Sequence, residues 1–196
     1  MNDLPKSSED YRSLAGKLVR FLHEEIGNTD TRTGWTKRNI EVLQRFADRE
    51  RLVSSPDKRN GKDEKQFLWD FVAYKANRGL VLVAESEWAN KTKDREAFQH
   101  DFEKLLYVRS PVKLMICWAK SKEKAEKLRG WVSELMRPSG RGCTCSEFSP
   151  GEIFLLYCTC SRECEFAYWL QINGQPGHLA VTNERFASVP MEWVLR

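Results

Sequence analysis

Three acidic residues, Asp70, Glu85 and Glu87, lie in a stretch whose pattern predicts a β-hairpin. Side chains alternate between the two faces of a strand, so Glu85 and Glu87 share one face of the second strand. If the turn is symmetric about the bond between residues 77 and 78, Asp70 falls opposite Glu85, with Cβ atoms roughly 4.5 to 5.5 Å apart. Two carboxylates this close in a buried sheet repel each other. A divalent cation or a raised pKa on one of them relieves the repulsion, and we favour the cation.

The strands that would position these acids are predicted within residues 68–88. Alternation along the second strand places Val81 on the face of Glu85 and Leu80 on the opposite face. Both strands carry apolar residues on both faces, which predicts a central sheet buried on both sides. Between them, Gly79 tolerates the positive φ that a tight turn needs.

An acid on one strand of a hairpin, followed by an acid-x-Lys tripeptide after an apolar run on the next strand, is the pattern of the PD-(D/E)XK nuclease-like superfamily. This chain resembles it, with Asp70 and then Glu85-Ser86-Glu87. Glu87 stands where most members carry lysine, although some restriction-endonuclease-like members have Glu there. The resemblance covers residues 10–136 in element order: helix, hairpin, helix, strand, helix. It implies that Asp70 and Glu85 ligate Mg²⁺ or Mn²⁺ and that Glu87 positions or deprotonates the attacking water.

The first predicted helix, residues 10–26, offers a third candidate ligand. Its apolar stripe consists of Leu14, Leu18, Phe21, Leu22 and Ile26. Glu25 falls near the middle of that stripe, where an acid is unusual unless it is paired or bound to a metal. In the resembled superfamily a first-helix acid often completes the metal shell, which makes Glu25 the candidate. The alternative is that the helix ends there and Glu25 is solvated.

A second helix is predicted at residues 95–107 and a strand at residues 112–119. Some relatives with a substituted tripeptide draw a lysine from this helix, so the resemblance implies Lys104 as the replacement catalytic lysine. Helical geometry gives a different expectation, because Lys104 lies away from the apolar stripe and should face solvent. Asp101 would then simply pair with Lys104 at i, i+3.

The whole chain of 196 residues predicts one α/β domain. We expect a central mixed β-sheet flanked by helices, with a restriction endonuclease-like core over residues 1–137. Residues 138–196 would form a β-rich C-terminal extension of the same domain, and residues 53–61 a polar loop. No apolar run approaches the ~20 residues of a membrane span, and the N-terminus does not resemble a signal peptide. These features predict a soluble, cytoplasmic protein without a membrane partner.

Basic residues flank the acidic hairpin on both sides, within a formal net charge of +4. The candidates for nucleic-acid binding are Lys58, Arg59, Lys62, Lys91, Lys93, Lys120 and Lys122. Cations around an acidic centre suit a phosphodiester substrate. DNA is the substrate that we favour, RNA is the alternative, and a merely solvated surface would explain the same charges. Restriction-like members often dimerise, so a homodimer is a further expectation.

Five of the six cysteines follow residue 142. If residues 143–160 form a hairpin, Cys143 pairs with Cys160 and Cys145 with Cys158, all on one face. Four thiolates in this arrangement could bind zinc. The spacing is not the usual C-x2-C knuckle, and packing as small apolar side chains or as free thiols is the alternative.

Two function classes follow from these observations. The first is a metal-dependent nuclease acting on DNA, with Asp70 and Glu85 holding the metal. The second is a catalytically inactive nuclease-fold module for binding or assembly, with or without stabilisation by zinc, and the missing lysine at position 87 motivates it. Neither a Walker loop, nor G-x-G-x-x-G, nor H-E-x-x-H occurs in the chain.

Overall fold

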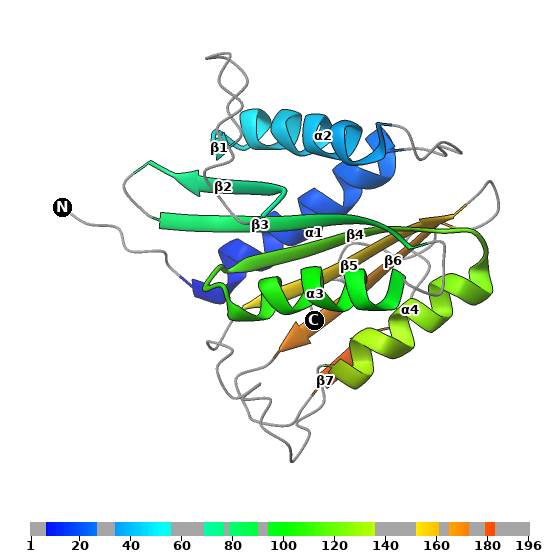
Figure 1. Cartoon of the computed structure of the whole chain (residues 1–196). Coiled ribbons are helices and arrows are strands. Elements are labelled where there is room, and N and C mark those ends of the chain that lie inside the picture. Colours follow the sequence, from blue (N-terminus) through cyan, green and yellow to red (C-terminus); the bar gives the residue numbers. More distant parts are fainter. Residues whose placement is uncertain are drawn as a thin grey trace.

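The structure of the chain is a computed structural model that describes residues 7–26, 34–55, 69–76, 79–89, 94–135, 152–160, 165–172 and 179–182. These ranges contain four helices and seven strands (Figure 1). In chain order they are α1 (Ser7–Ile26), α2 (Trp35–Arg49), β1 (Val53–Ser55), β2 (Phe71–Lys75), β3 (Gly79–Ala89), α3 (Asp94–Tyr107), β4 (Val112–Ala119), α4 (Lys122–Leu135), β5 (Ile153–Cys160), β6 (Glu165–Ile172) and β7 (Leu179–Thr182).

The strands form one mixed sheet in the order β1 to β7. Strands β3, β4 and β5 run parallel in the middle, and antiparallel pairs extend the sheet at both edges. Parallel neighbours need crossover connections, and here α3 lies between β3 and β4 in the chain, and α4 between β4 and β5. The fold is therefore α/β, a mixed sheet flanked by helices, as the sequence predicts.

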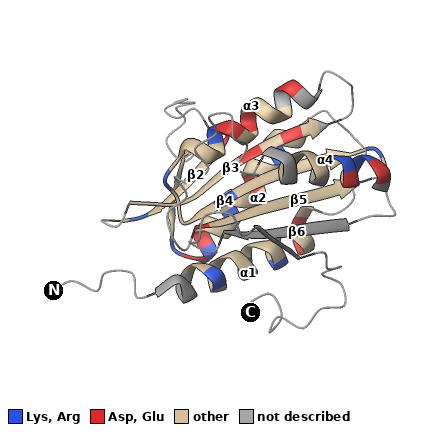
Figure 2. Ribbon diagram, turned by 90° about the horizontal axis from the view of Figure 1, so that it is seen from below, with Lys and Arg blue, Asp and Glu red and all other residues tan. Residues whose placement is uncertain are grey.

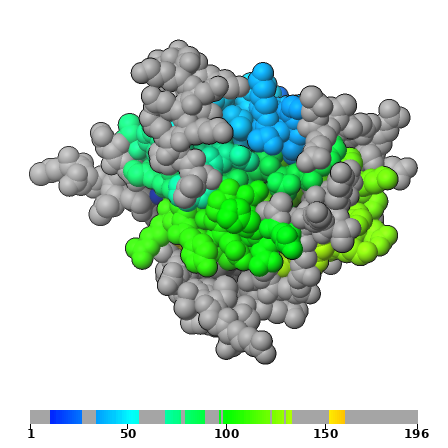
Figure 3. All heavy atoms as spheres, viewed as in Figure 1, coloured from blue at the N-terminus to red at the C-terminus, as the bar shows by residue number. Residues whose placement is uncertain are grey.

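Helices cover both faces of the sheet. On one face α1 and α2 pack against β-strand residues such as Leu82 and Ile116. On the other face α3 and α4 pack against Val83, Met115 and Phe154. Figure 3 shows this second face, with α3 in green lying across its centre beside the β2–β3 hairpin. Because both faces are buried, the parallel strands are apolar on both sides, as the sequence indicates.

The β2–β3 register agrees with the prediction in the part of the hairpin nearest the acids. Phe71 pairs with Ala84, and the next residues pair in step. The turn is centred on position 77 and not on the bond between residues 77 and 78, because Lys75 pairs with Gly79, whose φ is 81°. A bulge between Ala73 and Tyr74 accommodates this one-residue difference.

The bulge changes which face some residues of β3 occupy. Val81 packs with the core on the α1 and α2 side, whereas Leu80 packs against the core on the α3 side. Simple alternation predicts the reverse, so that part of the prediction is wrong. Beyond the bulge alternation resumes, and Glu85 lies on the α3 side, where its carboxylate contacts Lys104 of α3.

Helix α2 and strand β1 were not expected from the sequence. Helix α2 follows Gly34, which supplies no side-chain cap, so the usual start signal is missing. Strand β1 occupies the beginning of the loop expected at residues 53–61, where Val53 pairs with Tyr74. A three-residue polar edge strand has no alternating pattern of its own and forms because β2 offers a partner.

Strand β5 uses both of its edges inside the sheet. On one side it pairs with β4, with Cys158 opposite Cys117, and on the other it pairs with β6, with Cys158 opposite Phe166. The expected hairpin of residues 143–160 is therefore wrong, because no free edge remains for Cys145 to pair with Cys158. Among the described residues, no helix is both long and apolar enough to cross a membrane.

Candidate functional site

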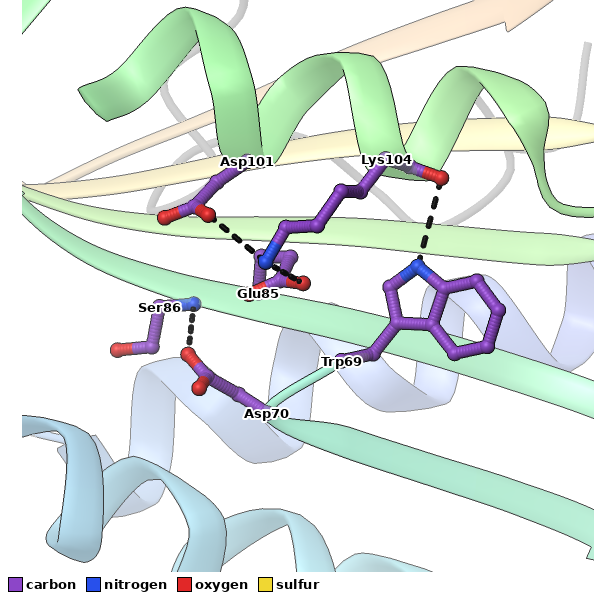
Figure 4. Close-up of polar contacts among 6 residues, drawn as sticks. All are labelled: Trp69, Asp70, Glu85, Ser86, Asp101 and Lys104. Atoms are coloured by element: carbon purple, nitrogen blue, oxygen red, sulfur yellow. Dashed lines mark hydrogen bonds and ion pairs between the residues drawn. The ribbon is translucent and has the colours of Figure 1, made fainter. Parts of the chain in front are cut away.

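The candidate site lies where β3 passes beneath α3. Figure 4 shows Asp70, Glu85, Asp101 and Lys104 converging there, from the residue before β2, from β3 and from α3. Asp70 immediately precedes Phe71, which pairs with Ala84, and the carboxyl groups of Asp70 and Glu85 lie close enough to interact. The sequence predicted this encounter.

Lys104 reaches from α3 into the group of acids. Its Nζ lies 2.7 Å from Glu85 Oε1 and 2.8 Å from Asp101 Oδ1 (Figure 4). Only 22% of the Lys104 side chain is exposed. The expectation that Lys104 faces solvent is therefore wrong, because its long aliphatic stem follows the helix surface down to the sheet. The expected i, i+3 pair with Asp101 is confirmed.

Asp70 is held by the backbone of β3. Its Oδ2 accepts a hydrogen bond of 2.9 Å from the backbone N–H of Ser86. The neighbouring Trp69 donates from Nε1 to the backbone carbonyl of Lys104 at 3.4 Å, a long contact that connects the start of β2 with α3 (Figure 4). The segment that carries Asp70 is thus attached to both elements that carry the other site residues.

Burial dominates the electrostatics of the two central acids. Glu85 is 1% exposed, and burial raises the pKa of its carboxyl to about 8, with Lys104 opposing the shift and Asp70 adding to it. Burial also raises the pKa of Asp70, and the hydrogen bond from Ser86 opposes that rise. Burial lowers the pKa of Lys104, but its contacts with Asp101 and Glu85 outweigh this effect, so its pKa is raised. Burial thus favours the protonated form of Glu85, and the adjacent Lys104 ammonium favours its carboxylate.

The donor chemistry of the site fits a hard divalent cation. Carboxylate oxygens are the ligands that Mg²⁺ and Mn²⁺ prefer, and Mg²⁺ commonly uses one or two carboxylates together with water and substrate phosphate. Glu85 Oε1 is buried and, among the described residues, has no well-aligned hydrogen-bond partner; Lys104 contacts it as an ion pair. In the described part of the chain, no set of three or more His, Cys, Asp or Glu side chains is arranged as a metal site. Asp70 and Glu85 are the two carboxylates here that could hold such an ion.

Glu87 and Glu25 are the other acids that the sequence puts forward. Glu87 is half-buried on β3, in register with Cys117 of β4. Glu25 does not join the site: its carboxylate forms a 2.7 Å ion pair with Arg45 of α2. Helix α1 packs on the sheet face opposite α3, so Glu25 cannot complete a shell around Asp70 and Glu85. The solvated alternative fits Glu25, whose side chain is 39% exposed.

Most of the expected nucleic-acid-binding residues, Lys58, Arg59, Lys62, Lys91 and Lys93, lie outside the described residues. Lys120 is exposed and directly follows β4, whose end is level with the end of β3. The side chain of Lys122 is also outside the described part. Helix α4 carries basic and acidic side chains together (Figure 2). Among them, Lys127 forms an ion pair with Glu123 at 2.9 Å.

The cysteines that the structure describes do not form a zinc site. Cys143 and Cys145 lie outside the described residues, and only the backbone of Cys160 is described. Cys158 is a free, fully buried thiol, and burial raises its pKa to about 12. Cys158 packs in the apolar core on the α3 and α4 side of the sheet, and the other three cysteines of the zinc prediction have no described side chain.

Asp101 is the site residue that sequence reasoning underestimated. The sequence predicts only an i, i+3 pair of Asp101 with Lys104, and nothing in the linear pattern shows that this pair lies over Glu85. Comparisons with family models, with curated proteins and with solved structures give no match to this chain. The site is therefore interpreted from its own geometry.

Proposed function

We propose that this protein is a metal-dependent phosphodiester hydrolase, a nuclease-like enzyme acting on DNA. The observation that carries the proposal is the contact of Lys104 with Glu85, next to Asp70. The motif of the resembled superfamily combines two acids with a lysine. This chain has Glu87 where that lysine stands. Helix α3 supplies the lysine from elsewhere in the chain.

Each residue has a distinct role in the proposed reaction. Asp70 and Glu85 would hold Mg²⁺ or Mn²⁺, which when bound supplies charge neutralisation at the phosphate and a more acidic water. Lys104, beside Glu85, would position the attacking water or stabilise negative charge on the phosphate. Asp101 would orient the Lys104 ammonium through their 2.8 Å contact. Glu87, two residues after Glu85 on β3, would position the attacking water or accept a proton from it.

The choice of nucleic acid as substrate is supported by charge. A phosphodiester needs cations for affinity in addition to the acids that hold the metal. The net charge of the chain is +4, and the exposed Lys120 lies at the edge of the sheet where β3 and β4 end. DNA is the substrate we propose.

Cleavage of supercoiled plasmid and of single-stranded DNA in Mn²⁺ tests the proposal. Wild-type protein should cleave at least one of them, and Asp70→Asn and Glu85→Gln should each abolish the activity. Glu123→Gln is the matched control, because Glu123 is an exposed acid on α4 and its loss should leave the rate unchanged. Cleavage that persists in the Asp70 and Glu85 variants would contradict the assignment, and cleavage of RNA alone would move the substrate class to RNA.

A second candidate is a nuclease-fold module that has lost catalysis and serves in binding or assembly. The position of Lys104 favours this second candidate, because its ammonium group already lies against the carboxylates of both Glu85 and Asp101. Calorimetric titration with Mn²⁺ separates the two candidates. Binding that disappears in Asp70→Asn and Glu85→Gln supports the enzyme, and the absence of any binding supports the inactive module.

A further inference from the structure

We infer that Asn39 of α2 is a positioning residue that orients Asp70 through Ser86, from the opposite face of the sheet. The inference rests on the proposed function and extends it to a residue outside the acidic cluster. Two contacts and one burial carry it: the hydrogen bond of Asn39 to Ser86, the hydrogen bond of Ser86 to Asp70, and the complete burial of Asn39.

Asn39 is a polar residue in an apolar surrounding. It is 0% exposed, on a helix face that otherwise buries Trp35, Val42, Leu43, Phe46 and Ala47. Its Nδ2 donates a 2.7 Å hydrogen bond to Ser86 Oγ, while its Oδ1 is buried without a partner among the described residues. Burying an amide with half of its hydrogen-bonding capacity unused is unfavourable, and an apolar residue would avoid that penalty. The buried position of Asn39 places its amide within hydrogen-bonding distance of the Ser86 hydroxyl.

Ser86 connects the two faces of the sheet. Its side chain is directed toward α2, and its backbone N–H donates to Asp70 Oδ2 at 2.9 Å (Figure 4). Strand β2 begins only at Phe71, so at this point the carboxylate of Asp70 takes the place that a strand carbonyl would occupy. Fixing the Ser86 side chain therefore fixes the N–H group that orients Asp70.

Ser86 is also the residue between Glu85 and Glu87. An anchor on Ser86 holds β3 at the position where Glu85 points toward α3, so one buried hydrogen bond steadies both proposed metal ligands. Residues that orient ligands in this way typically change metal affinity or activity by about 10- to 100-fold when they are mutated. Asn39 reaches neither the metal site nor solvent, so such an effect has to travel through Ser86.

Four variants of the full-length chain test the inference, with Mn²⁺ affinity by calorimetry and kcat/KM for DNA cleavage as the two measurements. Asn39→Leu removes the donor, and Ser86→Val removes the acceptor. Ser86→Thr has the shape of Ser86→Val but keeps the hydroxyl group. Val42→Ala creates a cavity on the same helix, at a residue that is 1% exposed, and leaves the hydrogen bond intact.

We expect Asn39→Leu and Ser86→Val each to weaken Mn²⁺ binding and kcat/KM by about 10- to 100-fold. The double variant should be no worse than either single variant, because both remove the same contact. Ser86→Thr and Val42→Ala should bind Mn²⁺ like wild type.

Equal affinity in Ser86→Val and Ser86→Thr would overturn the inference, and this pair decides the matter if Asn39→Leu does not fold. Wild-type protein that neither binds Mn²⁺ nor cleaves DNA would overturn the proposed function and this inference together, whereas an active wild type with unaffected variants would overturn the inference alone.

Discussion

At the scale of single residues, the site is defined by a carboxylate that the protein keeps out of water. Glu85 is 1% exposed, and transferring an unpaired carboxylate from water to a buried position costs on the order of several kcal/mol. Its pKa of about 8 expresses the same cost. Lys104 offsets part of the cost, because its ammonium lies 2.7 Å from Glu85. A carboxyl group kept in this condition, with a second acid beside it, marks a candidate functional site.

The role of Lys104 can be tested with Lys104→Met, which keeps the length of the side chain and removes its charge. We expect the rate of Mn²⁺-dependent DNA cleavage to fall by about 10²- to 10³-fold, the usual effect of removing one group that stabilises negative charge in the transition state. The matched control is Lys127→Met, because Lys127 pairs with one acid on the exposed side of α4. A Lys104→Met protein as active as Lys127→Met would show that Lys104 only balances charge.

The sequence predicts the meeting of Asp70 with Glu85 but not the part played by Lys104. The first depends on the hairpin register, which alternation and the turn residues constrain. The second depends on how close α3 lies to β3 and on the path of a flexible side chain, and a helical wheel contains neither quantity. Glu25 fails for a related reason, because a helical stripe does not tell which face of the sheet the helix covers.

At the scale of elements, the site depends on the β2–β3 hairpin and on the packing of α3 against it. On the turn side of the bulge after Ala73, the strand register differs by one residue from the register on the other side. The bulge therefore restores the register that brings Asp70 close to Glu85. Helix α3 is held by Phe98, Phe102 and Leu105, all fully buried against the sheet. Phe102 contacts Phe154 of β5, with ring centroids 5.1 Å apart. The position of Lys104 is therefore set by apolar packing of its neighbours on the helix.

Phe102→Ala tests this dependence on packing. Removing a fully buried phenyl ring should lower the free energy of unfolding by about 3 to 5 kcal/mol, measured by urea denaturation. Tyr107→Ala on the same helix is the control, because Tyr107 is 77% exposed, and we expect a change within about 0.5 kcal/mol. Equal losses in the two variants would contradict the packing of α3 described above.

At the scale of the whole molecule, the C-terminal extension completes the sheet. Strand β5 lies between β4 and β6, and α1, near the start of the chain, packs in the same core as Ile153 and Leu155. Lys113 of β4 and Glu152, just before β5, form a 2.7 Å ion pair that is almost completely buried. The described strands of the two predicted segments thus belong to one sheet and share one core.

Lys113→Met tests how strongly this ion pair holds the two segments together. Removing one partner leaves Glu152 buried and unpaired, so the free energy of unfolding should fall by about 3 to 5 kcal/mol, measured by urea denaturation. The double variant Lys113→Met/Glu152→Leu should recover most of that loss. Lys17→Met, which breaks a partly exposed ion pair with Glu50, should cost no more than about 1 kcal/mol. A Lys113→Met protein as stable as Lys17→Met would contradict the buried pairing.

The central claim is that Asp70 and Glu85 form a metal site beside Lys104. Anomalous diffraction from Mn²⁺-soaked crystals tests it most directly, because it locates the ion without relying on activity. We predict a single strong anomalous peak within bonding distance of the Asp70 and Glu85 carboxylates, with the Lys104 side chain next to it. A map with no peak at these two residues, or with Mn²⁺ bound only elsewhere, would contradict the claim.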